Sequence, residues 1–145
     1  QISLEIIGVD LMPDVVSLAQ SNAERNNLNV QFLQSSWFEN ITGQFDLIVS
    51  NPPYIDAQDE HLGQGDVRFE PLSALVANDA GYADLRHIIE LASSYLNSNG
   101  ALLLEHGWQQ GEKVRSIFQE NHWEMVETVR DYGDNERVTL GFWKK

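Results

Sequence analysis

The sequence lacks several features that would direct it to particular classes of protein. It contains no cysteine, which excludes disulfide bonds and thiolate metal sites. It is poor in basic residues, with nine lysines and arginines against 22 aspartates and glutamates. The formal net charge of −13 leaves no obvious basic patch for a phosphate backbone and argues against a nucleic-acid substrate. No apolar run approaches the roughly 20 residues of a membrane span, and no signal-peptide pattern opens the chain.

What is present is ordinary material for one globular domain. The 145 residues are 42% hydrophobic and 21% charged, and a chain of this length buries about 70% of its unfolded surface. The histidines are scattered without a helical i, i+4 pair, so no metal site is expected at His61, His87, His106 or His122. We therefore expect a single domain over residues 1–145.

The stretch over residues 45–54 is the one around which the chain is organised. Residues 45–49 form a short apolar run, typical of a strand buried on both faces in a parallel sheet. Ser50 and Asn51 end the run, and two prolines then fix φ at about −65° and remove two backbone donors. A stiff turn after such a strand is where open α/β sheets bind their ligands. We therefore expect the functional site at residues 51–54.

The groups of this turn suit a planar NH2 group. The Asn51 side chain offers an acceptor oxygen, and the Pro52 carbonyl is a second acceptor on a residue without an N–H. Tyr54 adds an aromatic face and a hydroxyl. The turn is therefore suited to an amide or an aromatic amine. The alternative is a structural proline turn in which Asn51 satisfies local backbone groups.

The motif Asn51-Pro52-Pro53-Tyr54 resembles the signature of S-adenosylmethionine (SAM) methyltransferases that act on amino groups. Three further motifs make nearly the whole chain similar to the release-factor glutamine methyltransferase (PrmC/HemK) family: residues 66–72 (Asp-Val-Arg-Phe-Glu-Pro-Leu), 104–107 (Leu-Glu-His-Gly) and 131–133 (Asp-Tyr-Gly). The resemblance implies SAM as the cofactor. It implies, as partner and substrate, peptide chain release factors, in which the glutamine of a Gly-Gly-Gln tripeptide becomes N(5)-methylglutamine.

The same resemblance implies a fold. The fold would be the Rossmann-like class I methyltransferase fold, a three-layer αβα sandwich whose mostly parallel sheet ends in an antiparallel C-terminal hairpin. The absence of cysteine fits a cytoplasmic bacterial enzyme.

The beginning of the chain reads as half of a nucleotide-binding unit. Residues 4–10 form a strand that ends in Asp10, and Pro13 opens an amphipathic helix to residue 26 or 27. In such units an acidic residue binds the ribose hydroxyls about 20 residues after a glycine-rich loop. Asp10 is too near the start for that loop, so we expect the loop and a first strand to lie upstream. The alternative role for Asp10 is that of a helix N-terminal acid.

The expected upstream part has consequences for residues 1–145 taken alone. By resemblance, a small helical substrate-binding domain precedes the glycine loop, so this chain would be a partial catalytic domain. Without the loop it should bind SAM poorly. Without a central first strand it should expose sheet edges and self-associate.

A second cofactor contact is expected after a strand over residues 29–33. By resemblance, Trp37 forms a wall of the SAM pocket, and Asn51 also contacts the cofactor. Many members of the family have aspartate where this chain has Ser36, so a weaker hydroxyl replaces the usual acceptor for the adenine amine. The alternative for Trp37 is a core residue under a loop.

The remaining elements complete an α/β pattern. Residues 55–81 are too long for a tight connection and are typical of a lid or binding loop, with candidate polar contacts at His61, Asp66, Arg68 and Glu70. A helix is expected over residues 84–96, stopped by residues 97–100, with an inward face of Leu85, Ile88, Ile89, Leu91, Ala92 and Leu96. A strand over 101–105, a helix over 109–121 and two antiparallel strands over 125–129 and 137–143 follow.

A mechanism follows from the chemistry of an amide. Its nitrogen is a poor nucleophile because the lone pair is delocalised into the carbonyl. We expect the Asn51 side-chain oxygen and the Pro52 carbonyl to accept the two amide protons and stabilise charge that develops on nitrogen. Pro53 would keep the turn stiff, and Tyr54 would pack against the amide plane and exclude water.

Two other functions remain open. The first is an adenine or guanine amino methyltransferase acting on DNA or RNA, which would use the same turn chemistry and lose activity steeply with salt. The second is an inactive fragment that acts only as a structural or binding module, because the glycine loop is missing. The residues alone indicate methylation of a planar NH2 group and no particular substrate.

Overall fold

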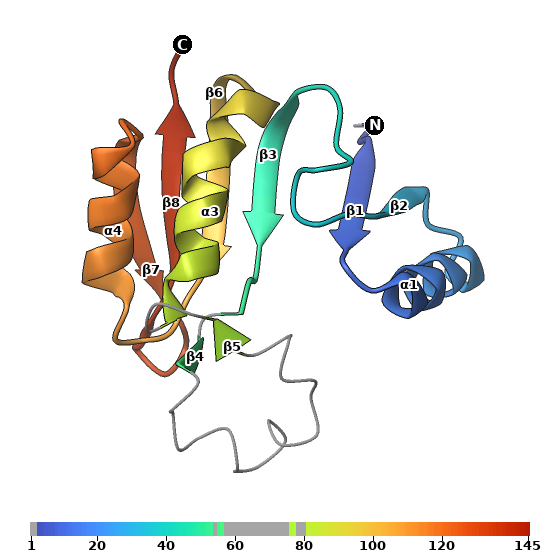
Figure 1. Cartoon of the computed structure of the whole chain (residues 1–145), viewed down its shortest axis with the longest axis horizontal. Helices are drawn as coiled ribbons and strands as arrows, with labels where there is room; N and C mark the ends of the chain where they lie inside the picture. Colours follow the sequence, from blue (N-terminus) through green and yellow to red (C-terminus); the bar gives the residue numbers. More distant parts are fainter. Residues whose placement is uncertain (1–2, 54, 57–75, 78–80) are drawn as a thin grey trace. The chain divides into compact units, whose positions relative to one another are not determined.

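The computed structural model describes residues 3–53, 55–56, 76–77 and 81–145. The chain divides into two compact units, Gln1–Gly43 and Gln44–Lys145. Each unit has its own sheet, as Figure 1 shows, and each is described separately.

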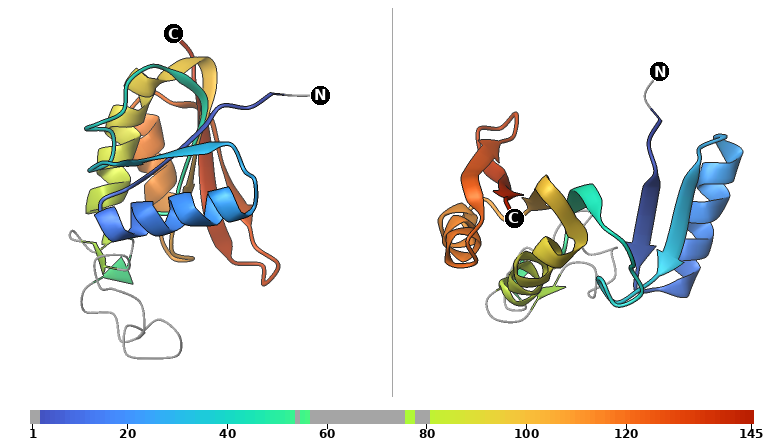
Figure 2. Two further views of the ribbon diagram at one scale, coloured as in Figure 1. Left: turned by 90° about the vertical axis from the view of Figure 1, so that its right-hand side faces the viewer. Right: turned by 90° about the horizontal axis from the view of Figure 1, so that it is seen from above.

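The first unit is a strand–helix–strand arrangement. Strand β1 (Ile6–Asp10) leads to helix α1 (Pro13–Arg25), and strand β2 (Val30–Gln34) pairs with β1 in parallel. Pro13 begins the helix and an acidic residue follows it in the first turn, as the sequence predicts. The register joins Asp10 to Gln34, so both strands end at the same edge. Helix α1 runs along this pair of strands (Figure 2).

The second unit is built on a four-stranded sheet in the order β3-β6-β8-β7. Strand β3 (Phe45–Ser50) pairs in parallel with β6 (Leu96–Glu105). Strand β8 (Glu136–Trp143) lies between β6 and β7 (Glu124–Arg130) and is antiparallel to both. The predicted antiparallel C-terminal hairpin is therefore confirmed.

Two helices cover one face of this sheet (Figures 1 and 2). Helix α3 (Ala83–Ala92) packs on β6, and helix α4 (Gly111–Glu120) packs on β7 and β8. Burial of apolar side chains between these layers is the main stabilising term. The buried set comprises Leu85, Ile88, Ile89, Ala92, Leu96, Leu102, Leu104, Val114, Ile117 and Phe118.

Trp123 closes one end of this core. Its ring lies edge-on to those of Phe118 and Trp143, with centroid separations of 5.5 Å and 5.3 Å. Its indole N–H donates to the Ile89 carbonyl at 3.2 Å, so the polar atom of this buried ring is satisfied. The ring therefore links the loop after α4 to helix α3.

The segment after α3 differs from the prediction. The helix ends at Ala92, a 3₁₀ turn η4 (Ser93–Tyr95) follows, and Leu96 is already the first residue of β6. Phe45 pairs with Leu96 but Leu47 pairs with Ala101, so residues 97–100 form an irregularity inside the strand. A polar stretch containing glycine is typical of both a bulge and a helix end, which explains the error.

Two burial predictions were also wrong. Leu91 is 40% exposed, because the buried stripe of α3 follows residues 85, 88, 89 and 92 and leaves position 91 on its flank. Strand β3 is not buried on both faces, since Leu47 and Val49 are 55% and 67% exposed. The reason is that α3 and α4 both cover the opposite face of the sheet.

The predicted long loop contains two short strands, β4 (Ile55–Asp56) and β5 (Val76–Ala77), which pair in parallel. Its candidate contacts His61, Asp66, Arg68 and Glu70 lie outside the described residues. Of the helices in the described ranges, none is long and apolar enough to cross a membrane. The same ranges contain no group of three His, Asp or Glu side chains able to hold a metal ion.

Candidate active site

Asn51 and the two prolines leave the sheet of the second unit at the carboxyl end of β3. Ser50 pairs with Leu104, so continuing the register brings Asn51 beside Glu105 at the end of β6. Pro52 is buried and Pro53 is half-buried, whereas Asn51 is exposed. The prolines therefore anchor the turn, and Asn51 is presented to solvent.

The Asn51 side chain makes no hydrogen bond to any described residue. Among the described residues, Asn51 therefore has no partner of the kind that the structural alternative requires, in which its side chain would satisfy the backbone of its own turn. Its acceptor oxygen and its donor NH2 group are both available to a ligand.

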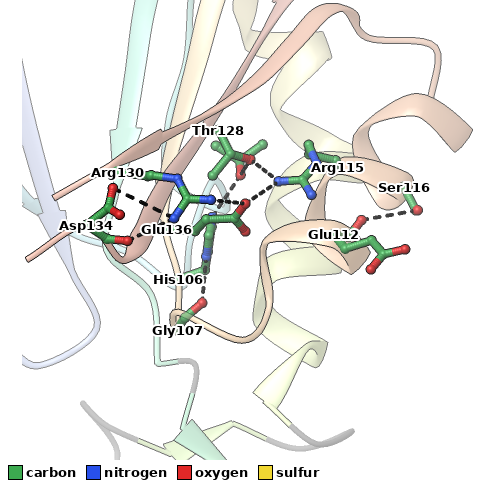
Figure 3. A network of polar contacts seen from close by, with 10 residues as sticks. His106, Gly107, Glu112, Arg115, Ser116, Thr128, Arg130, Asp134 and Glu136 are labelled. Carbon is green, nitrogen blue, oxygen red and sulfur yellow. Dashed lines mark hydrogen bonds and ion pairs between the residues drawn. The ribbon is translucent and has the colours of Figure 1, made fainter.

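A buried histidine follows the neighbouring strand end (Figure 3). The Nε2 atom of His106 lies 2.8 Å from Thr139 Oγ1, and its Nδ1 atom lies 2.8 Å from the Gly107 carbonyl oxygen. Thr139 Oγ1 lies 2.7 Å from Thr128 Oγ1, which is 2.7 Å from Arg115 Nη1. This polar chain crosses the hairpin from the end of β6 to helix α4.

The polar chain has one consistent direction of donation. Because the Gly107 carbonyl can only accept, Nδ1–H of His106 donates to it and Nε2 accepts from the Thr139 hydroxyl. Thr139 then accepts from Thr128, which accepts from Arg115. Burial lowers the pKa of His106, which favours the neutral imidazole that this arrangement needs, although the bond to Gly107 opposes the shift.

Asp10 ends β1 in the first unit. Its Oδ1 atom accepts the Met12 N–H at 2.9 Å, immediately before helix α1 begins. The other carboxylate oxygen makes no hydrogen bond to a described residue. Because a carboxylate can accept about four hydrogen bonds, a role at the helix start leaves capacity for a ligand.

Trp37 lies in a turn after β2 that a buried serine holds. The Ser35 hydroxyl donates to the Trp37 carbonyl at 2.8 Å and accepts the Asn40 N–H at 3.0 Å. The Ser35 N–H donates to the Asp10 carbonyl at 3.0 Å. Trp37 is half-buried and has a φ of 54°, in the left-handed region that bulky residues rarely adopt. Asp10 and Trp37 therefore share one edge of the first unit.

Comparison with protein families gives a match over nearly the whole chain. The family model described as "Methyltransferase domain" matches residues 2–139. The chain belongs to the methyltransferase-domain family.

The methyltransferase domain is also similar in sequence to a curated protein of about twice its length. The release factor glutamine methyltransferase of Haemophilus influenzae is 92% identical over 144 residues, which make up 99% of this chain and 49% of that protein. The chain thus spans about half the length of this relative.

Solved structures share the fold of the domain at low identity. A methyltransferase from Pyrococcus furiosus has a TM-score of 0.73 at 19% identity, covering 97% of this chain and 64% of that chain. A 16S rRNA N2 methyltransferase from T. thermophilus, solved with AdoMet and guanosine, has a TM-score of 0.70 at 21% identity, covering 98% of this chain and 32% of that chain. The domain has the Rossmann-like fold of class I methyltransferases, as the sequence predicts.

Within this methyltransferase domain, the predicted site residues form two groups. Asp10 and Trp37 lie together in the first unit, and Asn51, Pro52 and Pro53 lie at one strand end in the second. Tyr54 lies outside the described residues.

Sequence reasoning missed the supporting residues Ser35 and Thr139, because serine and threonine are common in turns and strands and carried no distinguishing pattern. The motif over residues 104–107 was the one signal near His106, and it indicated no role.

Proposed function

We propose that residues 1–145 form part of the catalytic domain of a protein-(glutamine-N(5)) methyltransferase. Its methyl donor is SAM, and its substrate is the Gly-Gly-Gln glutamine of peptide chain release factors. The observation that carries this proposal is the Asn51 amide, which is exposed on a proline-anchored turn and makes no hydrogen bond to a described residue. The 92% identity to a release factor glutamine methyltransferase supports the choice of substrate. Such a partner would place the enzyme in the cytoplasm.

The turn at the end of β3 suits the substrate amide. The Asn51 side-chain oxygen and the Pro52 carbonyl accept its two N–H groups and hold the amide plane in one orientation. Because Pro52 is buried and Pro53 half-buried, little of this geometry has to be ordered when the substrate binds. Tyr54 follows directly and would cover the amide plane.

The first unit suits the adenosine part of SAM. Asp10 Oδ2, which makes no hydrogen bond to a described residue, accepts hydrogen bonds from ribose hydroxyls. Trp37 offers its ring to the adenine, and the exposed Ser36 offers a hydroxyl to the adenine amine. Asn51 also contacts the cofactor, because the amide that it holds must face the methyl group. When bound, SAM supplies a methyl group on a sulfonium sulfur.

The transfer forms one N–C bond and breaks one S–C bond, with the electron pair left on sulfur. The amide nitrogen must present its lone pair in line with the methyl group, at about 3 to 3.5 Å. Asn51 and Pro52 set that direction and stabilise the positive charge that develops on nitrogen. One of the two N–H protons is lost to solvent after the methyl group has been transferred and the product has left the turn, because residues 51–54 contain no carboxylate to act as a base.

The test uses the full-length enzyme with SAM and a purified release factor. Mass analysis of the factor should show one added methyl group on the Gly-Gly-Gln glutamine. Methylation of an RNA or DNA oligonucleotide in place of the factor would overturn the substrate assignment. Absence of any transfer would favour the structural-module alternative.

A further inference from the structure

Two aromatic side chains stand out on the surface of the second unit. Trp108 is 55% exposed and Tyr132 is fully exposed. Among the described residues, they are the aromatic members of the exposed large hydrophobic set. Neither belongs to the core or to the proposed reaction site, and we call them the aromatic pair.

Both members of the aromatic pair lie at the end of the sheet where β3 and β6 terminate, which is also the end that carries Asn51. Trp108 follows the end of β6 by three residues. Glu105 pairs with Val138 and the His106 N–H donates to the Arg137 carbonyl at 2.8 Å, so the turn between β7 and β8 projects past the end of β6. Figure 1 shows that turn at the same end of the sheet as the end of β3. Strand β8 lies two strand spacings, roughly 10 Å, from β3.

The turn that carries Trp108 is held by local hydrogen bonds. The Gln110 N–H donates to the Gly107 carbonyl at 3.0 Å, and the Gly107 N–H donates to Gln110 Oε1 at 2.7 Å. The same carbonyl accepts from the buried His106 (Figure 3). Trp108 is therefore exposed on a turn whose backbone is fixed on both sides.

The turn that carries Tyr132 is held by one carboxylate. Asp131 Oδ1 accepts the N–H groups of Gly133 and Asn135 at 2.8 Å and 3.0 Å. Its Oδ2 atom accepts Arg137 Nε at 3.0 Å. A large exposed ring on a rigid turn loses little conformational entropy on binding, which is the property of residues that dominate protein interfaces.

The surrounding charges indicate the kind of partner. Arg115 and Arg130 both pair with Glu136, at 3.4 Å and 3.9 Å (Figure 3). Arg137 pairs with Asp131 at 3.0 Å. Arg130 also lies 3.9 Å from Asp134 Oδ1, so each arginine beside the projecting turn pairs with at least one carboxylate and is poorly placed to bind phosphates. With a formal net charge of −13, the chain favours a partner that carries basic side chains.

We propose that the aromatic pair is a docking surface for the polypeptide that carries the reacting glutamine. Trp108 and Tyr132 contact its apolar and basic side chains next to the reaction site, through apolar burial and cation–π contacts. The inference rests on the proposed function, because it takes the methyl acceptor to be part of a protein.

The experiment compares four forms of the full-length enzyme. They are wild type, the double variant Trp108→Ala/Tyr132→Ala, the single variant Tyr132→Ala and the control Leu91→Ala. Leu91 is the control, because it is exposed on α3 and lies outside the aromatic pair. For each form, kcat and KM are measured with an intact release factor, and binding of the factor is titrated directly. Affinity for S-adenosylhomocysteine shows whether the fold and the cofactor site are intact.

The double variant should raise the KM for the release factor and weaken its binding by about tenfold or more, as loss of interface hot spots does. Its kcat and its affinity for S-adenosylhomocysteine should stay within about twofold of wild type, as should all values for Leu91→Ala. The single variant Tyr132→Ala should raise KM by less than the double variant does, and its kcat should stay within about twofold of wild type.

An unchanged KM in the double variant would overturn the docking role. A loss confined to kcat would do the same, since it would assign the pair to the chemical step. An RNA oligonucleotide could also compete with the release factor for wild type but not for the double variant. That result would show that the surface binds a nucleic acid, and it would overturn the polypeptide partner. If wild type methylates no release factor, the proposed function itself fails and the docking role falls with it.

Discussion

The Nε2 atom of His106 and the Oγ1 atom of Thr139 lie 2.8 Å apart, and both side chains are fully buried. Neither can exchange this contact for water, so the bond ties the loop after β6 to the middle of β8. Through Thr128 the same chain of contacts reaches Arg115 on helix α4. The carboxyl edge that carries the proposed site is therefore held by polar contacts as well as by the apolar core.

Replacing Thr139 by valine should destabilise the protein. Thr139→Val keeps the volume but leaves the buried Nε2 of His106 without a donor and Thr128 without its acceptor. The expected loss is about 1–3 kcal/mol in the free energy of unfolding, measured by urea denaturation. Ser116→Ala is the control, because the exposed Ser116 hydroxyl donates to the Glu112 carbonyl and to no other described residue. This substitution should change stability by less than about 0.5 kcal/mol. Equal effects of the two substitutions would contradict the role of the polar chain.

Stability should fall on mild acidification because of His106. Burial lowers its pKa in the folded protein below the ordinary value of about 6.5, so the unfolded state binds a proton first as the pH falls. The free energy of unfolding should therefore decrease from about pH 6.5 toward the lower folded pKa and level off below it. Asp131 affects stability only at lower pH, below about 3.8, because hydrogen bonds from Asn135 and Arg137 lower its pKa from that value in the folded protein.

The check is the slope of unfolding free energy against pH, compared with that of His106→Gln. The variant lacks the titrating group, so its slope just below about pH 6.5 should be flatter. A variant with the slope of wild type would show that other groups cause the loss.

Removing the Ser35 hydroxyl should loosen the turn that carries Trp37. Ser35→Ala deletes one bond to the Trp37 carbonyl and one from the Asn40 N–H. We expect a loss of about 1–2 kcal/mol in stability and several-fold weaker binding of S-adenosylhomocysteine by the full-length enzyme. Ser17→Ala, at an exposed position of α1, should change neither the stability nor the affinity. Unchanged affinity in Ser35→Ala would separate the Trp37 turn from the cofactor site.

Gly141 on β8 should not tolerate a side chain. A Cβ atom at this position would lie 2.8 Å from Cδ1 of the buried Phe118, closer than van der Waals contact permits. Gly141→Ala is expected to cost about 1–3 kcal/mol in unfolding free energy. Adding Phe118→Leu should cost less in this background than alone, because the smaller side chain relieves the contact. Strictly additive losses would rule out the clash.

The elements with a clear period and clear ends were predictable. Val114, Ile117 and Phe118 recur at helical spacing, and they form the buried stripe of α4. Asn51 and its prolines interrupt an apolar run, and the turn occurs at that point after β3. In both cases a local pattern and the tertiary packing favour the same structure.

Features that depend on partners distant in sequence were not predictable. Residues 97–100 read as a helix end because nothing local shows that Leu96 pairs with Phe45. The exposure of Leu47 depends on which face of the sheet the helices cover, and an apolar run does not specify this. The buried bond between His106 and Thr139 joins residues 33 positions apart, so no motif spacing could indicate it.

The most direct test of the account is methyl transfer by Asn51→Ala in the full-length enzyme, followed by mass analysis of the Gly-Gly-Gln glutamine of a release factor. Because the Asn51 oxygen is proposed to hold the substrate amide, the variant should add no methyl group while its affinity for SAM stays within a few-fold of wild type. Methylation by the variant at the wild-type rate would contradict the assignment of Asn51, and with it the proposed mechanism.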